Sequence, residues 1–233
     1  MPESIVLNGY EIFPFKDNNH FLNFLDDGHW NNILVALNAE KLMKIDAELK
    51  DLVNNHIGYP DGIGAVLALK RKGISSGRIP GAEFWLDIID RHYKDKTFYL
   101  VGGKKEVIDM TVAKLKKNYP GINIVNYRDG YMDEAEYNEL LEDIVIKKPD
   151  IVFVAMGSPR QEYIMEEMYS KHEALYMGLG GSFDIYCDLK ERAPDFFRKN
   201  GLEWLYRLFK EPSRLSRQIV YVPFLYKVLR NKL

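Results

Sequence analysis

The clearest signal for the fold lies in the segment Ile151-Val152-Phe153-Val154-Ala155-Met156-Gly157-Ser158-Pro159-Arg160-Gln161-Glu162. Its apolar first half is typical of a short strand that is buried on both faces of a parallel sheet. A glycine then turns the chain, and the spacing from Arg160 to His172 predicts a helix. Strand, glycine turn and helix in this order form the repeating unit of a doubly wound α/β fold.

The same unit recurs along the chain on both sides of this stretch. Further strand-like runs lie at residues 33–36, 97–101, 122–125 and 174–179, and helical spacing is found at 39–53, 62–72, 82–93, 105–119 and 133–147. This alternation predicts a Rossmann-like parallel sheet with flanking helices and right-handed crossovers. Two β-prone runs around Asn8-Gly9 predict an N-terminal β-hairpin in front of it.

The overall composition excludes two broad classes of protein. Hydrophobic residues make up 46% of the 233 residues, which is enough to bury a core and rules out general disorder. The formal net charge is −2, so a partner such as nucleic acid is not expected. With one cysteine and no secretory signal pattern at Met1-Pro2-Glu3, we expect a reducing cytosolic location. No run reaches the roughly 18 apolar residues of a membrane-spanning helix.

The C-terminal part differs in charge from the rest of the chain. From Arg198 onward there are nine basic and two acidic residues, while residues 1–197 carry a net charge of −9. Strand-like runs also stop near Pro194, so the sequence predicts a domain over residues 1–194 and a helical appendage over residues 195–233. Aromatic and basic residues interleave in the appendage, as they do in helices that lie on anionic membranes. A basic face that only contacts solvent would show the same charge.

Glycine-rich turns follow three of the predicted strands. They are Gly102-Gly103-Lys104, Gly157-Ser158-Pro159-Arg160 and Gly178-Leu179-Gly180-Gly181-Ser182. Glycine lets a backbone approach a phosphate at the positive end of the following helix. Three such turns together favour a nucleotide diphosphate as ligand, although each alone could be a plain turn. Neither G-x-G-x-x-G nor the P-loop pattern is present, which disfavours a dinucleotide oxidoreductase and a P-loop NTPase.

Two further features suggest how such a ligand could react. Asp61 precedes a predicted helix near Gly62, where its carboxylate could act as general base toward a sugar hydroxyl, unless Pro60-Asp61-Gly62 is only a turn. No Asp-x-Asp pair and no histidine cluster is present, so neither a metal nor another cofactor is expected. Arginines must then balance the charge of the diphosphate, and the spacing of seven and three residues can align three of them, Arg207, Arg214 and Arg217.

The order of these motifs resembles one known family over nearly the whole chain. The segments that carry the resemblance are Leu34–Lys41, Pro60–Gly64, Val101–Lys104, Met156–Glu162, Gly178–Gly181, Arg192–Pro194 and Gly201–Arg214. They are similar to the WecG/TagA/CpsF bacterial glycosyltransferases. The resemblance implies a Rossmann-like fold and a metal-independent, inverting transfer from a UDP-sugar to N-acetylglucosamine on undecaprenyl diphosphate. It also implies a peripheral protein at the cytoplasmic face of the bacterial inner membrane.

The resemblance also implies roles for individual residues. Asp61 matches the general base, Gln161 a residue that orients sugar or acceptor, and Asn38 an asparagine after the first strand of the sheet. Arg207, Arg214 and Arg217 match arginines that hold the diphosphate. The remaining candidates for substrate binding are Gly62, Gly102, Gly103, Gly157, Arg160, Glu162, Gly180 and Gly181.

Within the family, the sequence looks most like the WecG type, which transfers N-acetylmannosaminuronic acid in enterobacterial common antigen synthesis. Ala36 stands where the teichoic acid branch has a threonine, and Cys187 stands where glycine is expected. A UDP-N-acetylmannosamine or UDP-hexose transferase for teichoic acid, capsule or exopolysaccharide stays an alternative. Arg78, Arg128 and Arg160 all stay open as readers of the sugar C6 group.

A different class of function also stays open. A non-catalytic UDP-sugar-binding assembly protein that docks on a membrane would show the same glycine turns, but it would not need Asp61 or aligned arginines. Homo-oligomers are a further option, because an exposed aromatic tail can self-associate.

Overall fold

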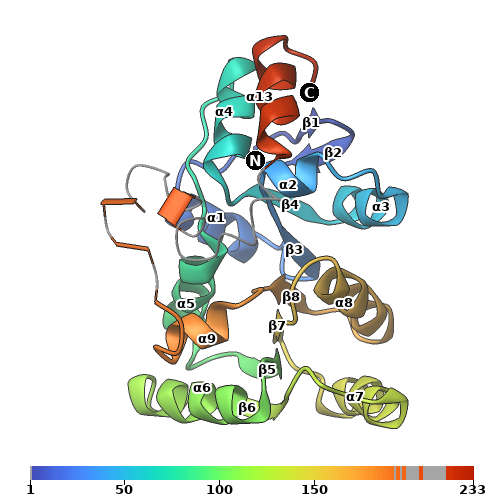
Figure 1. The fold of residues 1–233 in the computed structure, drawn as a ribbon. Helices are drawn as coiled ribbons and strands as arrows, with labels where there is room; N and C mark the ends of the chain where they lie inside the picture. The colour runs from blue at the N-terminus through green and yellow to red at the C-terminus, as the bar shows by residue number, and fades with distance from the viewer. Residues whose placement is uncertain (1, 192, 195, 198–204, 207–218) are drawn as a thin grey trace.

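A parallel sheet forms the centre of the protein (Figure 1). The computed structural model describes residues 2–191, 193–194, 196–197, 205–206 and 219–233. The sheet has six strands in the order β4-β3-β8-β7-β5-β6, and every neighbouring pair is parallel. The strands are β3 (Asn32–Leu37), β4 (Ile57–Pro60), β5 (Thr97–Gly102), β6 (Asn123–Arg128), β7 (Ile151–Ala155) and β8 (Leu175–Gly178). The predicted Rossmann-like α/β class is confirmed.

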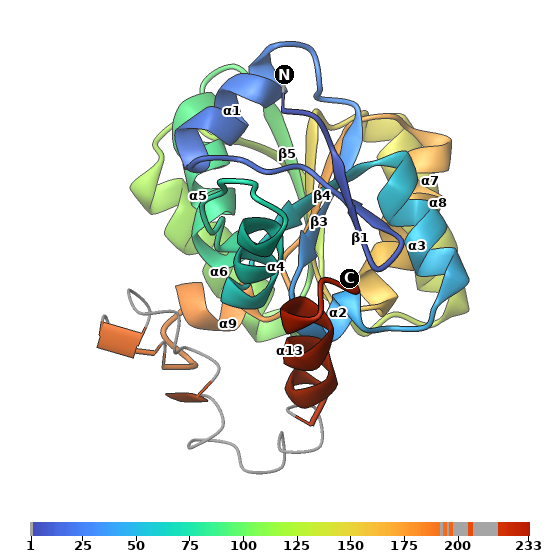
Figure 2. The same ribbon diagram turned by 90° about the horizontal axis from the view of Figure 1, so that it is seen from above.

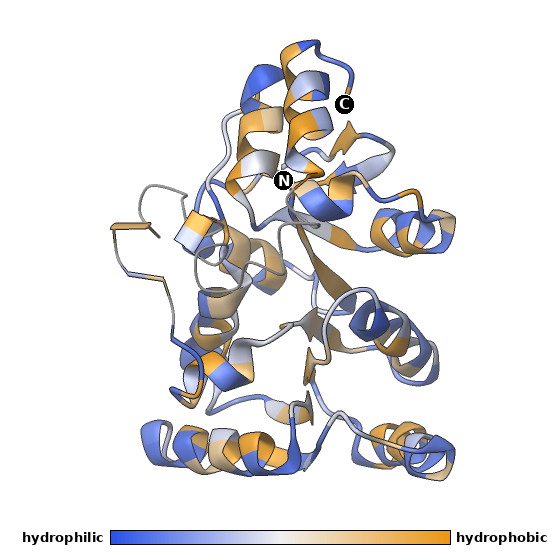
Figure 3. Ribbon diagram, in the orientation of Figure 1, coloured by the Kyte–Doolittle hydropathy of each residue, from blue (hydrophilic) through white to orange (hydrophobic). Residues whose placement is uncertain are grey.

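Helices cover both faces of the sheet, and each face has its own hydrophobic cluster. On one face lie α2 (Ala39–Leu42), α3 (Ala47–Asn55), α4 (Ile63–Arg71), α7 (Glu134–Lys147), α8 (Arg160–Lys171) and α13 (Tyr221–Leu229). On the other lie α1 (Asn18–Asp26), α5 (Gly81–His92), α6 (Lys105–Asn118) and α9 (Ser182–Tyr186). Strand β7 is buried along its whole length, as the apolar run predicts. Figure 3 shows hydrophobic residues in the sheet and on the helices that pack against it.

The N-terminal hairpin is also confirmed. Strand β1 (Ile5–Leu7) pairs antiparallel with β2 (Tyr10–Ile12). Asn8 and Gly9 connect them with φ values of 51° and 86°. Both values are positive, as a tight two-residue hairpin turn requires, and this is why Asn-Gly is a strong signal for it.

The prediction of one helix over residues 39–53 is wrong. The segment forms two helices, α2 and α3, because it contains two N-caps. The Asn38 side chain accepts from the Lys41 backbone N–H at 2.9 Å, and the Asp46 side chain accepts from the Leu49 N–H at 3.0 Å. Each cap satisfies a backbone donor that a continuous helix would bond internally. Helix α1 was not expected at all, and it begins at a third cap, Asp17.

Strand β4 was also missed, because its sequence contains glycine and proline. The strand lies at an edge of the sheet, where a proline does not interrupt the hydrogen-bond ladder on both sides. A side chain at Gly58 would collide with the carbonyl oxygen of Glu11, so the close approach of the hairpin requires glycine there. The same strand ends at Pro60 and delivers Asp61 to the carboxyl edge of the sheet.

The C-terminal helix α13 packs onto the body of the protein. Figures 1 and 2 both draw it beside α4 and α2, and its Phe224 and Val228 are buried there. The Arg71 guanidinium donates to the Leu229 carbonyl at 3.2 Å, and Lys227 donates to the Asn8 side chain at 3.1 Å. The division into residues 1–194 and 195–233 remains a prediction.

Candidate active site

The glycine turns meet where the chain leaves the sheet in opposite directions. Helix α6 follows β5 on one face of the sheet, while α8 follows the neighbouring strand β7 on the other face. Such a switch point leaves a crevice beyond the carboxyl ends of the strands, where ligands of this fold bind. Gly102, Gly103 and Gly157 lie at this point with φ values of 122°, 71° and 79°.

Glycine is required at this crevice because two loops pass each other closely. The Gly103 N–H donates to the Ala155 carbonyl at 3.1 Å. A Cβ atom at Gly102 would collide with the backbone of Ala155. Glycine therefore allows the backbones of the two loops to pack against each other at the end of the sheet.

Gln161 holds the turns after β7 and β8 together. Its side-chain oxygen accepts the N–H of Gly157 at 3.1 Å and that of Gly180 at 2.9 Å. The residue is only 5% exposed, and a side chain at Gly178 would collide with its amide. Gln161 thus joins two of the three glycine turns. Its direct contact with sugar or acceptor remains a prediction.

Gln161 is itself bonded to a buried ion pair that the sequence did not reveal. Lys41 Nζ lies 2.7 Å from Glu162 Oε1, and the two side chains are 7% and 1% exposed. The Gln161 amide nitrogen donates to the same Glu162 oxygen at 3.2 Å. Glu162 was expected to contact substrate, and its described contacts are with Lys41 and Gln161.

Asp61 lies at the end of β4, beside the end of β3. Its N–H donates to the Leu37 carbonyl at 3.1 Å, and its Oδ1 accepts the N–H of Gly81 at 2.8 Å. A Cβ atom at Gly62 would lie 3.0 Å from that of Asn38, so these two predicted residues are in contact. Asp61, Asn38 and Gly62 therefore form one corner of the carboxyl edge of the sheet.

Tyr59 lies between this corner and the ion pair. Burial is the main cause that raises the pKa of its hydroxyl, and the negative charges of Asp61 and Glu162 raise this pKa further. The hydroxyl is buried and has no hydrogen-bond partner among the described residues. Both carboxylates are thus close enough to raise the pKa of the same buried hydroxyl, which stays neutral.

An exposed aromatic ring borders the glycine turns. Tyr131 follows β6 and is 71% exposed. The loop that carries it is fixed to the turn after β5, because the Gly130 N–H donates to the Gly103 carbonyl at 2.8 Å. Tyr131 is not among the residues predicted from the sequence, although an aromatic residue directly after a strand and a glycine is a usable signal.

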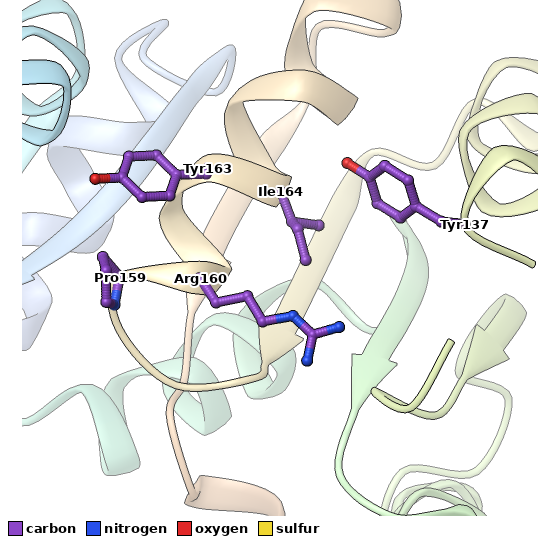
Figure 4. A pocket seen from close by; sticks show the side chains of 5 residues that line it. All are labelled: Tyr137, Pro159, Arg160, Tyr163 and Ile164. Carbon is purple, nitrogen blue, oxygen red and sulfur yellow. The ribbon is translucent and has the colours of Figure 1, made fainter. Parts of the chain in front are cut away.

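A groove of about 460 Å³ lies between α7 and α8, close to the turn after β7 (Figure 4). Its lining residues are Tyr137, Pro159, Arg160, Tyr163 and Ile164. Arg160 extends from the first turn of α8 toward the side on which Tyr137 lies. The exposed Arg160 therefore lines this outer groove, and its contact with substrate remains a prediction.

Of the other predicted cationic residues, Arg78 is partly buried on the segment between α4 and α5. Arg207, Arg214 and Arg217 lie outside the described residues. Arg128, one of three candidates for the sugar C6 group, is engaged with α7, because it donates to Glu139 and to the Glu136 carbonyl, both at 2.7 Å. Absence of a metal requirement remains a prediction.

The fold and the site together define a Rossmann-like α/β protein with glycine turns and a carboxylate at the carboxyl edge of its sheet. A comparison with protein families narrows this class. The sequence model of the family described as Glycosyl transferase WecG/TagA/CpsF family matches residues 16–233. The chain therefore belongs to this family of glycosyltransferases. Members act in surface polysaccharide synthesis, with a sugar donor and a lipid-linked acceptor.

Proposed function

We propose that the protein transfers N-acetylmannosaminuronic acid, or a related sugar, from UDP to N-acetylglucosamine on undecaprenyl diphosphate. The observation that carries this proposal is the position of three glycine turns at the carboxyl edge of the sheet, two of them at the switch point, with Asp61 at the end of β4 on the same edge. The glycines let a phosphate approach the backbone, the first turns of the following helices offer N–H groups and the positive end of a dipole, and a diphosphate spans more than one turn.

In the proposed reaction, Asp61 accepts the proton of the acceptor hydroxyl while its oxygen attacks the anomeric carbon of the donor. The new glycosidic bond forms as the bond from that carbon to the UDP oxygen breaks, and UDP leaves with the electron pair. Attack from the opposite side inverts the anomeric centre. Arg207, Arg214 and Arg217 are proposed to stabilise the charge of the departing diphosphate.

Tyr131 supports the nucleotide part of this proposal. Its ring is exposed beside the turn after β5. A flat aromatic surface next to a phosphate site suits a nucleobase, because base and ring can stack. We therefore propose that the uracil of the donor lies on Tyr131 while its diphosphate follows the glycine turns.

We also propose peripheral contact with the cytoplasmic face of the bacterial inner membrane. Helix α13 points Phe224 and Val228 inward, and its other side exposes Val222, Leu225, Tyr226 and Leu229. Residues 219–233 contain three basic residues and no acidic one. An apolar face bordered by lysine and arginine suits an anionic lipid surface. No helix in the described ranges has the length and apolarity needed to cross a membrane.

The direct experiment is an assay of UDP release. The protein is incubated with a panel of UDP-sugars, including UDP-N-acetylmannosaminuronic acid, UDP-N-acetylmannosamine and UDP-glucose, with and without a soluble lipid-diphosphate N-acetylglucosamine analogue. Release that requires the acceptor supports a transferase and identifies the donor. UDP-sugar binding without release, for every donor and with the acceptor present, would instead support the non-catalytic assembly protein.

A further inference from the structure

We propose that Lys41 and Glu162 are positioning residues that fix the amide of Gln161 and thereby hold two glycine turns in place for the nucleotide. The inference rests on the proposed function only in naming the nucleotide as ligand. Lys41 lies after β3, Glu162 after β7, and the turn that they help to fix includes Gly180 after β8. The chain of contacts therefore joins the ends of three strands.

Glu162 determines the orientation of the Gln161 amide. The Gln161 side chain could present either its oxygen or its nitrogen to the loop N–H groups of Gly157 and Gly180. Only the oxygen can accept them. Glu162 Oε1 accepts from the Gln161 nitrogen at 3.2 Å, and this bond selects the orientation in which the oxygen faces the loops.

Lys41 compensates the charge of the carboxylate that selects this orientation. Glu162 is 1% exposed, and its second oxygen has no hydrogen-bond partner among the described residues. A buried carboxylate is costly unless a positive charge compensates it. Lys41, at 2.7 Å, supplies that charge and holds the carboxylate where its Oε1 accepts from Gln161.

The turns after β7 and β8 depend on Gln161. The only hydrogen bonds found for the N–H groups of Gly157 and Gly180 in the described structure are those to Gln161. The Gly103 N–H is held differently, by the backbone of Ala155. Loss of the Gln161 orientation should therefore release the turns after β7 and β8 while the turn after β5 stays in place.

The test measures amide hydrogen exchange at these glycines and the affinity for UDP. Lys41→Met removes the charge at similar length. We expect faster exchange at Gly157 and Gly180, unchanged exchange at Gly103, and a UDP dissociation constant raised on the order of 10- to 100-fold, because loops that shift by about 1 Å lose much of their alignment. Unchanged exchange at Gly157 and Gly180 would overturn the proposal.

A swap of the two neighbouring groups tests the orientation directly, and it applies even if Lys41→Met does not fold. Gln161→Glu places a second carboxylate against Glu162 and should release both turns. Adding Glu162→Gln returns a donor to the pair and the original net charge, so it should restore most of the protection and UDP affinity. A double variant no better than Gln161→Glu alone would contradict the proposal.

Tyr99→Phe is the matched control for a general loss of stability. The Tyr99 hydroxyl donates to Asp143 at 2.8 Å on another part of the sheet. Its loss should lower the melting temperature without changing exchange at Gly157 and Gly180 or the UDP affinity. If the wild-type protein itself binds no UDP, the proposed function fails, and the exchange measurements still decide the positioning role.

Discussion

Replacement of Phe224 by alanine should release the C-terminal helix from the body of the protein. Phe224 is fully buried, with its ring against Gly64 of α4. A phenylalanine side chain buries roughly 150–250 Å², which at about 25 cal/mol per Å² corresponds to some 4–6 kcal/mol. Measured Phe→Ala changes in cores cost about 3–5 kcal/mol.

The remaining contacts of the helix are about as large as this loss, and they must also offset the conformational entropy of ordering the helix. Val228 is its other buried residue and contributes about 1.5–3 kcal/mol. Hydrogen bonds from Arg71 and Lys227 add about 0.5–1.5 kcal/mol each. A helix of nine residues is not stable alone in water. We therefore expect α13 to detach locally before the sheet unfolds.

Hydrogen exchange with mass spectrometry measures this directly. If about 3 kcal/mol of docking free energy is lost, exchange in Phe224 to Arg230 should accelerate on the order of 10²-fold, while strand β7 stays protected. Val222→Ala is the control on the same helix, because Val222 is 73% exposed, and it should change stability by less than about 0.5 kcal/mol. Continued protection of α13 in Phe224→Ala would refute the packing argument.

Three further predictions concern catalysis, pH and membranes. Asp61→Asn should lower turnover by ~10²–10⁴ at unchanged UDP affinity, measured by acceptor-dependent UDP release, and near-normal turnover would remove Asp61 from the mechanism. Burial is the main cause that lowers the pKa of His56, so the unfolded state binds the proton first, and the unfolding free energy should fall as the pH drops below about 6.5. His56→Gln should flatten this dependence in urea titrations between pH 7.5 and 5.5, and an unchanged slope would contradict it. Leu225→Glu should weaken sedimentation with anionic vesicles, whereas Ile146→Glu, an equally drastic change on α7, should not, and equal effects would argue against contact through α13.

Much of the fold could be predicted because it rests on local patterns. Strands β3, β5, β7 and β8 are buried on both faces, so their sequences are apolar runs that stand out. Strand β4 could not be found this way, because it contains a glycine and a proline. The glycine is required by the close approach of the hairpin, and the proline is tolerated because the strand lies at the edge of the sheet. The break between α2 and α3 depends on the caps Asn38 and Asp46, which a search for helical spacing overlooks.

The candidate site was predictable in part for similar reasons. Glycines and an aspartate after strands carry a direct signal, and the structure brings several of them to one edge of the sheet. The role of Lys41 could not be predicted, because lysines are usually exposed and its partner lies 121 positions away. The packing of Phe224 on Gly64 likewise depends on residues far apart in the sequence.

A titration with UDP, followed by the NMR signals of backbone amides, tests the central claim most directly. If the crevice between β5 and β7 binds the nucleotide diphosphate, the largest shifts should occur at Gly103, Gly157 and Gly180 and in the loop of Tyr131. Shifts confined to the opposite edge of the sheet or to the groove between α7 and α8, with the glycine amides unchanged, would contradict the claim.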